Sequence, residues 1–147
     1  MKTLRLTKEF QFEMSHALNG YDGLCKNIHG HSYRLFVTVK GTPEQDIHSP
    51  KYGMVLDFSI LKSIVKEEIE KQFDHALVLY SQSPLLQALK AEDIRIVAVP
   101  YQPTCENLLI DFAERIRSKL PNDVFLYSLR LYETRMSYAE WFADDNR

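Results

Sequence analysis

The sequence predicts an α+β fold in which helices cover one face of an antiparallel sheet. Stretches of alternating apolar and polar residues lie near both ends of the chain, and such alternation is typical of half-buried strands. Two strands precede the first amphipathic helix, unlike the regular alternation of a parallel α/β protein. The chain of 147 residues suits one domain over residues 1–147. About four strands leave open sheet edges, so we expect self-association.

The first part of the chain predicts two strands joined by a long connection. Apolar side chains recur with a loose period of two over residues 3–15, which indicates the first strand. A twelve-residue connection, 17–28, carries Asn-Gly and Asp-Gly turn signals. The second strand includes His31, alternates in the same way and ends at Gly41, before a polar loop over 44–53.

The rest of the chain alternates between helical and extended patterns. Asp57 is a suitable N-cap for the first helix, and Pro at the start favours the second. In the first strand after the last helix, strict alternation places Leu126 on the face opposite Leu129. The predicted elements are a helix over 58–72, a short helix from Ser83-Pro84, a strand over 94–99, a helix from Pro103-Thr104 to Leu120, and strands over 123–133 and 137–142.

Composition and charge exclude several classes of protein. A formal net charge of -2 argues against a strongly basic nucleic-acid-binding domain, so no nucleic-acid partner is expected. No apolar run reaches the roughly 20 residues that a membrane helix needs, and the N-terminal stretch lacks the apolar core of a signal peptide. The two cysteines, Cys25 and Cys105, are too few for a disulfide framework. We expect a cytoplasmic protein with free thiols and no membrane partner.

Three of the five histidines cluster in the sequence and predict a metal site. His29 and His31 stand two positions apart in a strand, so both side chains point to the same side. His16 ends the preceding strand and can reach the same point if the two strands are neighbours, while Gly30 permits close backbone approach. Three imidazoles without a carboxylate suit Zn²⁺ with an open fourth position. The alternative is three histidines that share no ligand.

Cys25 has two possible roles beside this cluster. It can be the fourth ligand, which would close a structural zinc site in a non-catalytic domain. If it does not bind the metal, a thiol near a cation and imidazoles is suited to act as a thiolate base or nucleophile. The long connection over 17–28 favours the second role, because loops of this length in compact domains tend to be functional.

The remaining candidates carry weaker signals. Asp74 and His75 are adjacent, but adjacency in sequence does not by itself orient one toward the other. Glu106 lies in the first turn of its helix, where the helix dipole favours a carboxylate without any function. Glu133 ends a mostly apolar strand, which exposure can explain. Cys105 is expected to pack as a small apolar residue.

Six segments in order resemble the 6-pyruvoyl-tetrahydropterin synthase family. They are FEMSHAL, CKNIHGHSY, GMVLDFSILK, FDHALVLY, QPTCENLL and LYET, and they cover nearly the whole chain. The short spacing between the cysteine and His-Gly-His is similar to the bacterial branch, the 6-carboxy-tetrahydropterin synthases (QueD-like). The chain departs from the family where Phe73 precedes the Asp-His pair and where Leu79-Tyr80 replaces the common Leu-Asn.

The resemblance implies roles for nine residues. In the family's scheme a metal, a thiol and an Asp-His pair act on a pterin, whose amino-pyrimidine edge is held by a carboxylate that accepts two parallel N–H bonds. Carried over by position, the zinc ligands are His16, His29 and His31, the catalytic thiol is Cys25, the second proton-transfer pair is Asp74 and His75, and the pterin pocket is formed by Glu133, Thr104 and Glu106.

The resemblance also implies an architecture and a reaction. The family has the T-fold (tunnelling fold), a four-stranded antiparallel sheet with two main helices on one face; sheets of three subunits join in a barrel, and two rings form a hexamer with active sites at subunit boundaries. The implied lyase uses Zn²⁺ to convert dihydroneopterin triphosphate to 6-carboxy-tetrahydropterin, releasing acetaldehyde and triphosphate, for queuosine biosynthesis. A 6-pyruvoyl-tetrahydropterin product for biopterin synthesis is the alternative. No nicotinamide or flavin is expected.

Overall fold

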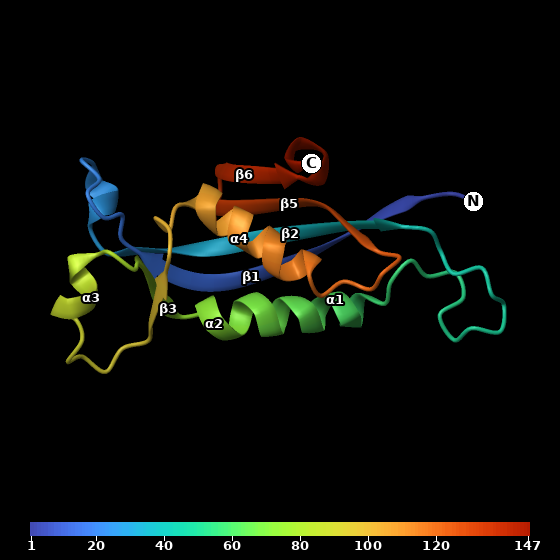
Figure 1. The fold of residues 1–147 in the computed structure, drawn as a ribbon, viewed down its shortest axis with the longest axis horizontal. Coiled ribbons are helices and arrows are strands. Elements are labelled where there is room, and N and C mark those ends of the chain that lie inside the picture. The colour runs from blue at the N-terminus through green and yellow to red at the C-terminus, as the bar shows by residue number, and fades with distance from the viewer.

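The computed structural model describes all 147 residues and contains one six-stranded sheet (Figure 1). Its strands are β1 (Leu4–His16), β2 (His29–Gly41), β3 (Ala76–Tyr80), β4 (Ile96–Val99), β5 (Phe125–Thr134) and β6 (Ser137–Phe142). Their order across the sheet is β4-β3-β1-β2-β5-β6. Strands β1, β2, β5 and β6 pair in antiparallel fashion, whereas β3 is parallel to both β1 and β4. The predicted α+β class is confirmed, but the predicted four-stranded antiparallel sheet was incomplete.

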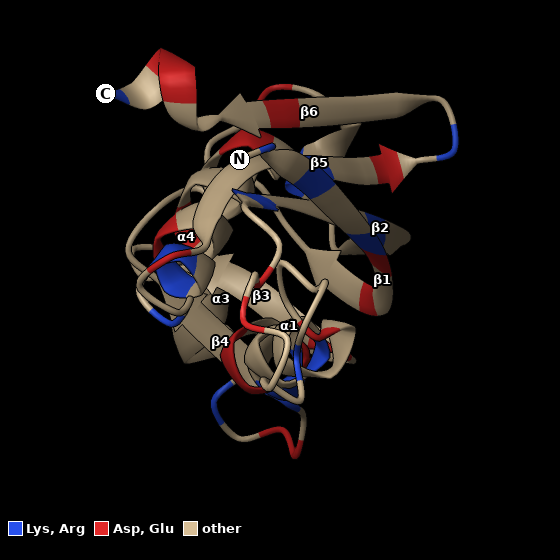
Figure 2. Ribbon diagram, turned by 90° about the vertical axis from the view of Figure 1, so that its right-hand side faces the viewer, with Lys and Arg blue, Asp and Glu red and all other residues tan.

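The two main helices, α1 (Phe58–Val65) and α4 (Cys105–Arg117), lie on one face of the sheet, as predicted. The short helix α3 (Pro84–Ala88) instead packs on the opposite face of β3, against Leu77 and Leu79. Figure 2 shows the strands curving around α4 and α1, which share one side. A carboxylate oxygen of Asp57 accepts the Ser59 N–H at 2.9 Å and begins the first helix, as its sequence position predicts. No helix is long and apolar enough to cross a membrane. The helical elements are α1 (Phe58–Val65), a π-helical turn (Lys66–Glu70), α2 (Lys71–Phe73), α3 (Pro84–Ala88) and α4 (Cys105–Arg117), with 3-10 turns at Leu24–Lys26 and Ala143–Asn146.

The core fills the space between the helices and the concave face of the sheet. Alternate residues of β1 and β2 are buried there, and those between them face outward. Phe112 of α4 is fully buried, with its ring centroid 6.0 Å from that of Phe12 and 5.3 Å from that of Phe73. The same alternation carries His16, His29 and His31 onto this helix-facing side at one end of the sheet.

Strand β3 was not predicted from the sequence. It pairs in parallel with the end of β1, at Met14–His16, and with β4 on its other side. Because Ala76–Leu79 are all buried, the strand shows no apolar–polar alternation. A five-residue apolar run that is separated from a helix by only two residues gives no periodic signal of its own.

Strand β5 contains an irregularity that corrects the predicted faces. Leu126 pairs with Val39 and Ser128 pairs with Thr38, so Tyr127 is an extra residue in the ladder. This β-bulge brings Leu126 and Leu129 to the same buried side, and the strict alternation predicted for 123–133 was therefore wrong. Beyond the bulge, Glu133 follows Tyr132, which pairs with Arg34 of β2, and its carboxylate lies on the helix-facing side near His16 and His31.

Candidate functional site

Three histidine rings converge at one end of the sheet. His16 lies directly opposite His29 in the β1–β2 ladder, and His31 follows two residues later on the same face. One nitrogen of each ring lies within 4.8 Å of the others, so the group could hold a metal ion. The neighbouring strands that the sequence required for this convergence are present.

Backbone carbonyls fix the orientation of two of the rings. The Nδ1 of His16 lies 2.6 Å from the Pro103 carbonyl oxygen, and the Nδ1 of His29 lies 2.7 Å from that of Asn27. Because a carbonyl can only accept, each Nδ1 carries the proton and each Nε2 presents a lone pair. The two Nε2 atoms are 3.0 Å apart. Two facing lone pairs suit a shared cation, so this donor set fits Zn²⁺.

Burial lowers the pKa of two of these imidazoles. His16 is almost fully buried, and desolvation is the main cause that lowers its pKa, opposed in part by the Pro103 carbonyl. Desolvation likewise lowers the pKa of His31, opposed by the charge of Glu133. Since a metal binds the neutral ring, lowered pKa values favour coordination near neutral pH.

Glu133 lies beside the histidines rather than apart from them. Its Oε1 is 3.5 Å from the Nε2 of His16 and 3.7 Å from the Nε2 of His31. Behind it, the fully buried Tyr33 hydroxyl has no hydrogen-bond partner. Burial raises the pKa of Tyr33, and the negative charge of Glu133 adds to the shift. The sequence analysis did not single out Tyr33, although it shares the inward parity of His29 and His31.

The two predicted pocket residues of α4 occupy different positions. Thr104 is half-buried and caps the helix, its hydroxyl accepting the Asn107 N–H at 3.2 Å. It directly follows Pro103, whose carbonyl orients His16. Glu106 is exposed and lines a separate cavity of about 290 Å³ between α4 and β6. Thr104 therefore adjoins the segment that orients His16, whereas Glu106 lines the cavity beside β6.

The two cysteines differ in environment. Cys25 is exposed on the 3-10 turn and lies outside the group of candidate metal donors. Cys25 is therefore not placed as a fourth metal ligand in this structure. Cys105 is buried and its Sγ contacts the Leu131 carbonyl oxygen at 3.3 Å, in keeping with the predicted packing role. Burial raises the pKa of Cys105 to about 12, which keeps this thiol protonated.

Asp74 and His75 contact each other through an unusual backbone geometry. His75 has a φ of 61°, the left-handed region that non-glycine residues seldom adopt. Its N–H donates to the Glu13 carbonyl at 2.6 Å, and Asp74 Oδ1 accepts the Glu13 N–H at 2.9 Å. The same carboxylate oxygen is 3.0 Å from the Nδ1 of His75. The backbone of β1 thus holds the pair in place.

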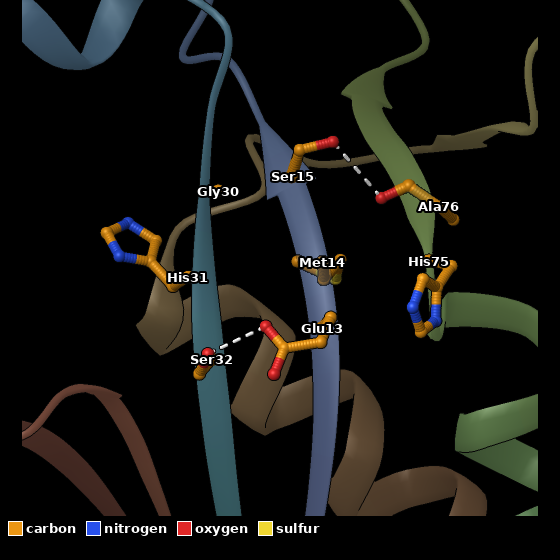
Figure 3. A pocket seen from close by; sticks show the side chains of 8 residues that line it. All are labelled: Glu13, Met14, Ser15, Gly30, His31, Ser32, His75 and Ala76. Atoms are coloured by element: carbon orange, nitrogen blue, oxygen red, sulfur yellow. Dashed lines mark hydrogen bonds between the residues drawn. The ribbon is translucent and has the colours of Figure 1, made fainter.

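The Asp-His pair lies on the other face of the sheet from the three histidines. His75 lines an open cavity of about 340 Å³ together with residues of β1 and β2, most of which face outward. His31 also lines this cavity, but its ring points away from His75 (Figure 3). Among the outward-facing residues, Glu13 and Ser32 are joined by a 2.7 Å hydrogen bond. Glu13 alternates with Met14, which is buried on the helix-facing side. Within one chain the ring of His75 therefore does not face the ring of His31.

Comparison with known proteins identifies relatives over almost the full length. Residues 5–144 match the family model described as 6-pyruvoyl tetrahydropterin synthase. The 6-carboxy-5,6,7,8-tetrahydropterin synthase of Haemophilus influenzae is 38% identical over 146 residues, covering 93% of this chain and 97% of that protein. The enzyme of the same name from Rickettsia typhi is 30% identical, covering 93% of this chain and 99% of that protein.

Solved structures with the same fold are also found. An uncharacterized protein from Wolinella succinogenes has a TM-score of 0.81 at 20% identity, covering 97% of this chain and 99% of its own. The 6-pyruvoyl tetrahydropterin synthase of Caenorhabditis elegans has a TM-score of 0.71 at 22% identity, covering 97% of both chains. These structures share the fold, and the sequence matches extend the likeness through the histidine-bearing strands. The chain belongs to the 6-pyruvoyl tetrahydropterin synthase family.

Proposed function

We propose that the protein is a zinc-dependent lyase that converts dihydroneopterin triphosphate to 6-carboxy-tetrahydropterin, releasing acetaldehyde and triphosphate, in queuosine biosynthesis. The observation that carries this proposal is the convergence of three imidazoles, two of them with the proton fixed on Nδ1. The names of the Haemophilus and Rickettsia relatives support the choice of product.

The three histidines would hold zinc through their inward-facing ring nitrogens. When bound, zinc supplies a Lewis acid that acidifies the hydroxyl and C–H groups of the substrate side chain. His16 and His31 are suited to this role because burial holds their pKa values down, so protons compete less with the metal. The buried position of His16 also excludes water from one side of the site.

Glu133 is proposed to bind the pterin ring. Its carboxylate is part-exposed and lies beside the histidines, so it can accept N–H bonds from an amino-pyrimidine edge placed next to the metal site. The Tyr33 hydroxyl beneath it has no hydrogen-bond partner in the ligand-free chain and can donate to a bound ligand. In the same proposal Thr104 contributes to the pocket as the N-cap of α4, and Glu106 contributes from the first turn of that helix.

Proton transfer is proposed to use Cys25 on one side of the substrate and His75, oriented by Asp74, on the other. Because the sheet separates His75 from the histidine group of its own chain, the pair that serves one site would come from another subunit. Open edges support such assembly: β6 has a single neighbour, and β1 meets β3 only at Met14–His16. Trimeric rings paired into a hexamer would cover the open sheet edges and would bring the Asp-His pair of one subunit to the site of another.

Mass spectrometry of the product tests the reaction. The zinc-loaded protein is incubated with dihydroneopterin triphosphate, and we expect 6-carboxy-tetrahydropterin and acetaldehyde. A pyruvoyl-tetrahydropterin product would instead support the alternative reaction, which the family name and the Caenorhabditis structure favour. No consumption of substrate by the metal-loaded protein would contradict both.

Two cysteine variants separate the lyase from a non-catalytic zinc-stapled domain. Cys25→Ala should abolish turnover while zinc content stays at that of the unmodified protein, because the thiol lies outside the donor group. Cys105→Ala is the matched control and should keep turnover, because that thiol is buried and protonated. Loss of zinc and unfolding in Cys25→Ala would show that Cys25 is a structural ligand.

A further inference from the structure

The segment just before α4 contacts both the histidine group and the connection that carries Cys25. The Pro103 carbonyl accepts a hydrogen bond from the Nδ1–H of His16 and so orients that ring. One residue earlier, the Gln102 side chain reaches the connection that carries Cys25. The segment itself is fixed to α4, because Asn107 Nδ2 donates to the Gln102 carbonyl at 3.0 Å and the hydroxyl of Thr104 caps the helix.

Gln102 pairs with the peptide backbone of Asn19 on both sides of its amide group. The Asn19 N–H donates to Gln102 Oε1 at 2.9 Å, and Gln102 Nε2 donates to the Asn19 carbonyl at 2.7 Å. These two bonds reproduce the pairing that a neighbouring strand would offer, across 83 positions of sequence. Both groups are part-buried, so the bonds are shielded from competing water.

This pairing is the main polar attachment of the Cys25-bearing connection to the rest of the fold. The other hydrogen bonds of residues 18–26 stay within the connection or join it to Asn27. One of them runs from the Leu18 N–H to the Cys25 carbonyl at 2.9 Å. The peptide that Gln102 holds is therefore adjacent to the residue that holds Cys25. Beyond it the turn is solvated, and Leu24 is 86% exposed.

We propose that Gln102 is a positioning residue that fixes the Cys25 thiol relative to the histidine group. The inference rests on the proposed function, in which Cys25 is the reacting thiol. The stretch from Gln102 to Thr104 fixes two positions at once. Pro103 positions the His16 ring, and Gln102 positions the connection that carries Cys25. Nothing in the motif QPTCENLL marks Gln102 for this role, because its partner lies in a distant loop.

Amide hydrogen exchange and steady-state kinetics of the zinc-loaded protein test this role. Gln102→Met keeps the length of the side chain and removes both hydrogen bonds, and Gln102→Ala removes the side chain as well. The matched control is Gln87→Ala on the exposed face of α3. In both Gln102 variants we expect faster exchange at Leu18 and Asn19 by about tenfold or more, because each neutral hydrogen bond is worth roughly a factor of five in a local opening equilibrium.

The kinetic expectation follows from the loss of thiol position. In both Gln102 variants kcat should fall by about tenfold while KM changes by less than about twofold, because a misplaced catalytic group slows the chemical step more than binding. Zinc content should be unchanged, and Gln87→Ala should behave as the unmodified protein.

Two outcomes would overturn the inference. Unchanged exchange at Asn19 would show that Gln102 does not hold the connection, and faster exchange with normal kcat would show that its hold has no bearing on the reaction. Failure of the proposed function gives a different result, since the unmodified zinc-loaded protein would then not consume dihydroneopterin triphosphate, or Cys25→Ala would keep full turnover. A Cys25→Ala variant without activity beside an active, normally exchanging Gln102→Met would refute only the role of Gln102.

Discussion

Replacing Tyr33 with Phe removes one oxygen atom from the core directly beneath the histidines. The ring itself is fully buried and stacks on Phe12 at 5.3 Å, so its apolar contacts survive the change. The hydroxyl has no hydrogen-bond partner in the structure. Because a buried unpaired hydroxyl costs about 1–3 kcal/mol, the metal-free Tyr33→Phe variant should gain that much in free energy of unfolding. For a chain of this size each 1 kcal/mol corresponds to roughly 2–4 °C in Tm.

Urea unfolding of the chelator-treated protein measures this gain as a higher midpoint with an unchanged slope. Two protein concentrations are compared, because assembly would add to the apparent stability. The control is Tyr101→Phe, which removes a hydroxyl that donates to Asp111 and should lose about 1.5–3 kcal/mol. If Tyr33→Phe is destabilised like the control, the hydroxyl has a partner, with the Glu133 carboxylate the nearest candidate, and the reasoning fails.

Three further predictions concern the thiols, the histidines and the core. Iodoacetamide should modify one thiol per folded chain, Cys25, and a second, Cys105, only in urea, because burial protects Cys105 and raises its pKa; two modified thiols in the folded protein would contradict this. The apparent zinc affinity should stay constant as the pH is lowered and should fall only below the ordinary histidine pKa of about 6.5, because burial lowers the pKa values of His16 and His31. Isothermal titration calorimetry measures this affinity, and a steep fall that begins above about pH 7 would contradict the prediction. Phe112→Ala should lose about 3–5 kcal/mol in urea unfolding, since the ring is fully buried between two aromatic neighbours, and a loss below about 1 kcal/mol would show that the core is loosely packed.

Period-two patterns gave the long strands and, through them, the histidine cluster. In β1 and β2 one face is buried and the other exposed, so the sequence records which way each side chain points. The inward parity of His29 and His31 follows directly, and the pairing of His16 with His29 needed only that the two strands be neighbours. The metal group was therefore accessible to sequence reasoning because it lies on regular, half-buried strands.

Other features depend on contacts that no local pattern records. Strand β3 is buried on both sides, so it lacks alternation, and its parallel pairing with β1 is set by tertiary packing. The bulge at Tyr127 shifts the faces of β5 by one residue without a Gly or Pro to mark it. The left-handed backbone of His75, and its place on the far face from His16, arise from hydrogen bonds with Glu13. Likewise, the hold of Gln102 on Asn19 joins positions far apart in the chain.

Zinc K-edge X-ray absorption on the metal-loaded protein, with and without a pterin ligand, tests most directly whether three imidazoles hold a metal that keeps an open position. The account predicts three nitrogen neighbours at about 2.0–2.1 Å and a fourth, oxygen neighbour from solvent that is replaced when the pterin is added. A sulfur neighbour at about 2.3 Å, or a full shell of protein ligands that stays the same with the pterin present, would contradict it.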